Sequence, residues 1–142
     1  ATLAQVASLP ERGFLVVFRG TLMTNESAPG ENDALEAWDY EGCVGCKVHA
    51  GHQARWRSLQ RPLFAHLDAL GCTPGDSIFV TGHSEAAAMA TLAMANLQAR
   101  GGYNVLLSYT FGASRVGNND FAVFFDSLFG RHVSVFRLTH GS

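Results

Sequence analysis

Runs of apolar residues alternate with polar and glycine-containing stretches along the chain, and four of these runs predict strands. Residues 13–18 form a continuous apolar, β-branched run, which is typical of a strand buried on both faces of a parallel sheet. The other three runs cover residues 77–81, 104–111 and 132–138. We expect these four segments to build the sheet of the domain.

Helical spacing replaces the strand pattern in three segments, which cover residues 53–70, 85–100 and 118–129. In the first, the large apolar residues fall at spacings of three and four, as on an amphipathic helix. Pro62 lies inside that helix and predicts a kink or a break. The second is rich in alanine and apolar on nearly all sides. Asn118 or Asn119 is expected to cap the third.

The order of these elements predicts the fold class. Residues 21–42 are polar and without a clean period, so we expect a long loop there, with a short helix at residues 34–38. The resulting order is β-loop-α-β-α-β-α-β. Strands separated by helices need crossover connections, which predicts an α/β domain with a mainly parallel sheet.

Composition and charge narrow the classes of function. The 142 residues are 47% hydrophobic and 15% charged, enough for the core of one domain or of a piece of one. The formal net charge is −2 without any Lys/Arg run, which argues against a nucleic-acid partner. No apolar stretch reaches the roughly 18–20 residues of a membrane span. Ala1 and Ser142 look like cut ends, so we expect residues 1–142 to be one domain truncated at both ends.

One junction carries candidate chemistry. The strand ending at Thr81 meets the helix starting near Glu85 across Gly82, His83 and Ser84. A serine on such a sharp strand-to-helix turn exposes its hydroxyl at the edge of the sheet, beside free N–H groups that can hold an oxyanion. The alternative is a serine that only caps a buried helix. We expect His83 to pack and hydrogen-bond beneath the turn.

The three cysteines suggest a second, different chemistry. Cys43 and Cys46 are close enough in sequence for one small disulfide, and Cys72 is expected to be a buried, inert thiol. With His49 and His52, the first two cysteines also give the spacing C-x2-C-x2-H-x2-H. All four are zinc-ligand types, so a small zinc module stays an alternative, although the spacing is too tight for a zinc finger.

Five segments, in order, resemble the class 3 (fungal-type) lipase family of the α/β-hydrolase superfamily, including secreted fungal triacylglycerol lipases and feruloyl esterases. They are residues 18–21 (Phe-Arg-Gly-Thr), 43–51 (Cys-Val-Gly-Cys-Lys-Val-His-Ala-Gly), 80–84 (Val-Thr-Gly-His-Ser), 109–118 (Tyr-Thr-Phe-Gly-Ala-Ser-Arg-Val-Gly-Asn) and 137–140 (Arg-Leu-Thr-His). Together they cover nearly the whole chain. The resemblance implies an α/β-hydrolase core, here the central portion of that fold.

The resemblance also implies residue roles. Ser84 would be the nucleophile that forms an acyl-enzyme, and the backbone N–H groups of Thr21 and Glu85 would hold the oxyanion. The segment from Leu22 to Trp38 would be the lid. The substrate would be a carboxylic ester, foremost an acylglycerol, met in transient contact with a lipid interface, and no cofactor or metal is needed.

A local disulfide between Cys43 and Cys46, with a structural His49, is likewise implied by the resemblance. An oxidised pair indicates an oxidising compartment, so we expect a secreted protein. The family pattern places the catalytic acid directly after Ser142 and the catalytic histidine later, so neither triad partner is expected within this chain.

Four positions depart from the family pattern. Ala86 stands for the usual Gly, Ser114 for the usual Pro, and His52 where an aromatic usually stands. Glu85 replaces the usual Leu directly after the serine. A carboxylate about 6 Å from a developing oxyanion opposes it by roughly 3 kcal/mol, on the order of a hundredfold in rate. A catalytically inactive, lipase-like binding domain is therefore the main alternative function.

Overall fold

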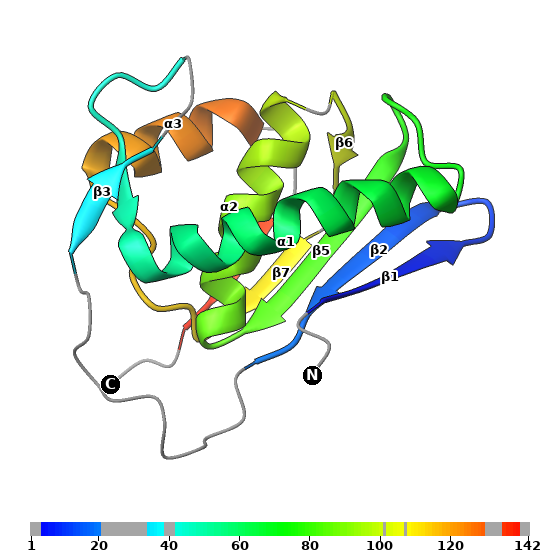
Figure 1. The fold of residues 1–142 in the computed structure, drawn as a ribbon, viewed down its shortest axis with the longest axis horizontal. Coiled ribbons are helices and arrows are strands. Elements are labelled where there is room, and N and C mark those ends of the chain that lie inside the picture. Colours follow the sequence, from blue (N-terminus) through cyan, green and yellow to red (C-terminus); the bar gives the residue numbers. More distant parts are fainter. Residues whose placement is uncertain are drawn as a thin grey trace.

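The computed structural model describes residues 4–20, 34–38, 42–100, 102–106, 108–129 and 135–139 (Figure 1). Six strands of this part form one sheet in the order β1-β2-β5-β7-β8, with β6 paired beside β5. Their bounds are β1 Ala4–Leu9, β2 Gly13–Phe18, β5 Ser77–His83, β6 Asn104–Val105, β7 Ser108–Phe111 and β8 Val135–Leu138. Within this sheet, the β1–β2 pair is antiparallel and the other pairs are parallel. The predicted α/β class with a mainly parallel sheet is confirmed.

Helices α1 (Ala50–Ala69) and α2 (Glu85–Ala99) cover one face of the sheet, and α3 (Asn119–Phe129) packs beside α2 (Figure 1). The strand side chains that point toward these helices are buried, as Val16 on β2 and Ile78 on β5 illustrate. Tyr109 and Phe111 alternate to the opposite face of the sheet and are exposed. The core of the described residues therefore lies between the sheet and the helices.

Three expectations about individual elements are wrong. Residues 34–38 hold no helix: β3 (Leu35–Ala37) pairs antiparallel with β4 (Lys47–His49), because a backbone partner is worth more than the helix propensity of so short a segment. Helix α1 starts three residues earlier than predicted, and it does not break at Pro62 but continues to Ala69. Both Pro62 and Ser58 are exposed, so water can reach the Ser58 carbonyl that loses its N–H partner. The predicted strand 104–111 consists of two strands, β6 and β7.

Asn118 caps α3, as predicted. Its Oδ1 accepts the backbone N–H groups of Phe121 (3.0 Å) and Lys47 (3.0 Å), and its Nδ2 donates to the Gly45 carbonyl (2.9 Å). One side chain thus joins the helix to β4 and to the loop before it. We expect Asn118→Ala to lower the free energy of unfolding by about 2 kcal/mol, since a cap and two further bonds are lost.

The measurement for Asn118→Ala is urea denaturation. Asn119→Ala is the matched control, because Asn119 is exposed at the first position inside the helix. Equal stability of the two variants would show that the Asn118 network contributes nothing.

Candidate active site

The turn between β5 and α2 holds Ser84 in an unusual backbone conformation. Its φ is 59° and its ψ is −127°, and Glu11 is the one other non-glycine residue with positive φ in the described part of the chain. Such a conformation costs on the order of 1–3 kcal/mol and persists only where the surrounding structure enforces it. Ser84 is exposed, and its side chain makes no capping hydrogen bond to α2. The interpretation of Ser84 as a simple helix cap therefore lacks its defining bond.

Gly82 allows the turn to be this tight. A Cβ on Gly82 would lie 2.5 Å from the carbonyl oxygen of Ala86, in the first turn of α2. The methyl groups of Ala86, which replaces the usual glycine, and of the following Ala87 are fully buried, so both fit between helix and strand. His83, by contrast, is exposed, so the expectation that it packs beneath the turn is wrong.

Neighbouring strands fix the position of the turn. The N–H of Ser84 donates to the carbonyl of Phe111 at the end of β7 (2.9 Å), and the N–H of Ala87 donates to the carbonyl of Ser84 (3.0 Å). On the other side, the end of β2 lies against β5, and a Cβ on Gly20 would be 3.4 Å from the His83 carbonyl oxygen. The chain segment that leads to residue 21 thus ends beside the turn.

Two of the predicted site residues lie outside the described residues, namely Thr21 and Leu22. Trp38, the predicted end of the lid segment, is described and buried, with its ring in an edge contact with Phe121 (5.6 Å between centroids). The backbone N–H of Trp38 donates to the Cys46 carbonyl (3.0 Å). The side chain of Trp38 is therefore packed in the core and is not exposed as on a free lid.

Polar side chains meet beside the turn, although they come from distant parts of the sequence. The Glu85 carboxylate forms an ion pair with the Arg55 guanidinium of α1 and lies 3.9 Å from Nδ1 of His52. Nε2 of His52 is hydrogen-bonded to Oγ of Ser114, 3.0 Å away. Burial, and then the charges of His49 and Arg55, lower the pKa of His52 from 6.5 to about 4. His52 is therefore neutral at physiological pH.

The neutral His52 predicts a pH dependence of stability. The pKa of His52 is lower in the folded than in the unfolded chain, so the unfolded chain takes up a proton first as the pH falls. The free energy of unfolding is therefore highest above about pH 6.5 and decreases as the pH falls toward 4. At about 1.36 kcal/mol per pKa unit, the loss approaches about 3 kcal/mol. Urea denaturation between pH 7 and pH 4 measures it.

His52→Phe is expected to remove this part of the acid dependence, because no proton is then taken up at the position. His66→Asn on the exposed side of the same helix is the matched control. An acid limb that keeps its full slope in His52→Phe would contradict the assignment.

Two of the three cysteines form a disulfide, which argues against the zinc site. Cys43 and Cys46 are joined in a disulfide, so both sulfur atoms of the zinc hypothesis are already bonded. Nδ1 of His49 accepts the backbone N–H of His52 (3.3 Å) and so caps α1. No group of three or more His, Cys, Asp or Glu side chains suited to a metal occurs in the described part of the chain. Cys72 is buried, and burial raises the pKa of its thiol to about 11, as expected of an inert cysteine.

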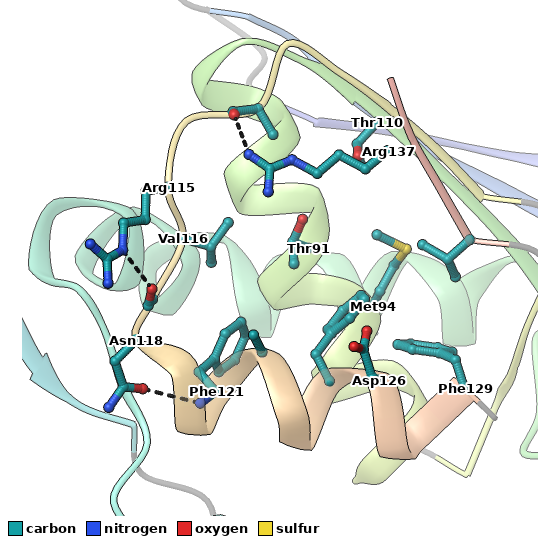
Figure 2. A pocket seen from close by; sticks show the side chains of 15 residues that line it. Thr91, Met94, Thr110, Arg115, Val116, Asn118, Phe121, Asp126, Phe129 and Arg137 are labelled. Atoms are coloured by element: carbon teal, nitrogen blue, oxygen red, sulfur yellow. Dashed lines mark hydrogen bonds between the residues drawn. The ribbon is translucent and has the colours of Figure 1, made fainter. Parts of the chain in front are cut away.

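A cavity of about 430 Å³ lies between α2, α3 and strands β7 and β8 (Figure 2). Its wall is largely apolar, with Met94, Phe121 and Phe129 among the residues around it. Arg137 lies at its edge and donates to the Ala113 carbonyl (3.0 Å), as Figure 2 shows. Ser84 and Glu85 are not among the lining residues, so this cavity is separate from the turn. No helix of the described residues is long and apolar enough to cross a membrane.

The parallel sheet and the strand-to-helix turn with an exposed, positive-φ serine define an α/β-hydrolase fold. A family model described as "Lipase (class 3)" matches residues 15–142. The chain therefore belongs to the class 3 lipase family.

Similar proteins agree with this assignment. Over 99 residues, the chain is 38% identical to secreted mono- and diacylglycerol lipase 1 of Fusarium solani. This alignment covers 69% of this chain and 28% of that protein. Over 138 residues, it is 30% identical to lipase A of Sodiomyces alcalophilus, and this alignment covers 85% of this chain and 33% of that protein. The crystal structure of the lipase from Rhizopus microsporus var. chinensis superimposes with a TM-score of 0.72 at 30% identity, over 96% of this chain and 49% of that one. The chain thus spans half or less of the length of these relatives.

Proposed function

We propose that Ser84 is the nucleophile of a carboxylic ester hydrolase. The observation that carries the proposal is the backbone of Ser84, held at φ 59° on a strand-to-helix turn with its side chain exposed and not used as a helix cap. In the proposed reaction, the hydroxyl oxygen attacks the ester carbonyl, the alcohol leaves, and water then releases the acid from the acyl-enzyme.

The N-terminal end of α2 supports the second part of the proposal, an oxyanion hole. The first N–H groups of a helix have no partner within the helix and lie at the positive end of its dipole. We assign one oxyanion donor to the backbone N–H of Glu85, the first residue of α2, and the other to Thr21. The assignment to Thr21 is supported by Gly20, the residue before it, which lies beside the His83 carbonyl. No metal or organic cofactor takes part.

The named relatives suggest the substrate and the compartment. Two of them are a secreted mono- and diacylglycerol lipase and a lipase, so we propose acylglycerols as substrates, met at a lipid surface and admitted by a lid between Leu22 and Trp38. The disulfide between Cys43 and Cys46 fits a secreted protein. We assign the triad acid and base that activate Ser84 to residues outside the described part of the chain.

Hydrolysis of mono-, di- and triolein by the full-length protein tests the proposed function, with release of oleic acid as the measured product. We expect turnover that is lost on treatment with a serine-reactive fluorophosphonate. Unchanged esters and an unmodified Ser84 would instead support the alternative, a lipase-like binding domain, which the carboxylate of Glu85 beside the turn favours.

A further inference from the structure

The carboxylate of Glu85 poses a specific problem for the proposed chemistry. It belongs to the residue whose backbone N–H is assigned to the oxyanion hole. An uncompensated charge about 6 Å from the oxyanion, at an effective dielectric constant of about 20, would slow acylation on the order of a hundredfold. An enzyme with this side chain at this position therefore needs a way to offset the charge.

The structure places a cation directly on this carboxylate. Nη1 of Arg55, from the second turn of α1, pairs with Oε1 of Glu85. The Glu85 side chain is 28% exposed and Arg55 is 43% exposed, so solvent screens the pair and it adds little to stability.

The carboxylate oxygen that pairs with Arg55 also lies near His52, which is hydrogen-bonded to Ser114, and both of these residues depart from the family pattern. His52 lies 3.9 Å from Oε1 through Nδ1, and its Nε2 is held by Ser114 at 3.0 Å. An aromatic residue and a proline in these two positions would offer the carboxylate no polar group. Three unusual residues that are separate in sequence thus form one polar cluster with Arg55.

We propose that Arg55 is a positioning residue for the reaction at Ser84: its guanidinium neutralises the Glu85 carboxylate and holds it away from the oxyanion that the Glu85 N–H binds. The proposal rests on the proposed ester hydrolysis. Arg55 acts through Glu85 and does not touch the substrate. The cluster of Arg55, Glu85, His52 and Ser114 is then a coordinated replacement of an apolar site, not a sign of lost activity.

Removing the guanidinium is expected to slow the chemical step. In the full-length protein, Arg55→Met should lower kcat for a dissolved ester about tenfold, with a change in KM below about twofold, because the bared carboxylate opposes only the charged transition state. The loss is smaller than a hundredfold because water screens the partly exposed carboxylate once Arg55 is gone. The rate of fluorophosphonate labelling of Ser84 should fall by a similar factor. Arg55→Lys, which keeps the charge, should restore most of both rates.

Two comparisons make the result specific. Arg61→Met is the matched control, because Arg61 is an exposed arginine on the same helix, six positions after Arg55. It should leave both rates unchanged. In a protein that carries Glu85→Leu, the change Arg55→Met should have an effect below about twofold, since no charge is left to neutralise.

The outcomes separate this inference from the proposed function. A wild-type protein that neither hydrolyses esters nor labels at Ser84 overturns both. A labelled, active wild type with an unchanged Arg55→Met variant overturns the role of Arg55 alone. So does a tenfold loss that persists in the Glu85→Leu background, which would mean that Arg55 contacts the substrate or supports the fold independently of Glu85.

Discussion

Replacing Ser84 by alanine is expected to lower kcat for ester hydrolysis by at least about 10⁴-fold and to abolish labelling by a fluorophosphonate. The hydroxyl oxygen is the atom that forms the acyl-enzyme, and a methyl group cannot replace it. The fold should survive, because the side chain of Ser84 is exposed and makes no capping bond to α2. Activity within about tenfold of the wild type would exclude Ser84 as the nucleophile.

A glycine at the same position separates strain from chemistry. Ser84→Gly should be as inactive as the alanine variant, yet it should raise the free energy of unfolding by about 1 kcal/mol, since glycine adopts a positive φ without steric cost. Glu11→Gly is the matched control, because Glu11 has a φ of 60° in the turn between β1 and β2. It should gain similar stability without loss of activity. A Ser84→Gly variant less stable than the alanine variant would show that the serine backbone is not strained.

The second large effect is expected at Gly82. The Cβ of Gly82→Ala would stand 2.5 Å from the Ala86 carbonyl oxygen and 2.8 Å from its carbon, both backbone atoms that cannot rotate away. Helix α2 must therefore move off β5. We expect a loss of about 3 kcal/mol or more in the free energy of unfolding, and at least about a hundredfold loss of activity in the fraction that folds, because the serine and the oxyanion donors separate.

Gly71→Ala distinguishes this clash from an ordinary glycine effect. Gly71 has a φ of 83°, and nothing lies within 4 Å of an added Cβ, so the cost there should be about 1 kcal/mol of backbone strain. Activity should be retained. Equal melting temperatures of Gly82→Ala and the wild type would contradict the close approach of α2 to β5.

The parts of the fold that could be predicted from the sequence are those whose pattern is set by burial. Strand β5 and helix α2 are continuous apolar segments because both lie in the core, and the sequence of their junction points to Ser84. Strand β1 escaped prediction because it is an edge strand with half of its residues exposed. Strand β3 escaped because three residues carry too little pattern, and its pairing with β4 is a long-range property.

In the candidate site, too, some features could be predicted from local sequence and others depend on long-range packing. The position of Ser84 and the disulfide of Cys43 with Cys46 follow from local sequence, whereas the environment of Glu85 does not. Arg55 resembles any exposed arginine of an amphipathic helix, and only the packing of α1 against α2 places it on a carboxylate 30 positions later. The available signal was indirect: several departures from one family pattern in a single chain suggest that the altered residues contact one another.

Mass spectrometry of the labelled full-length protein tests most directly whether the hydroxyl oxygen of Ser84 is the acylated atom. After reaction with a fluorophosphonate and digestion, the probe is expected on the peptide that contains Gly82, His83 and Ser84, with fragment ions that place it on Ser84. The Ser84→Ala variant should yield the same peptide unmodified. A probe found on another residue, or an active esterase whose Ser84 stays unmodified after complete inhibition, would contradict the account.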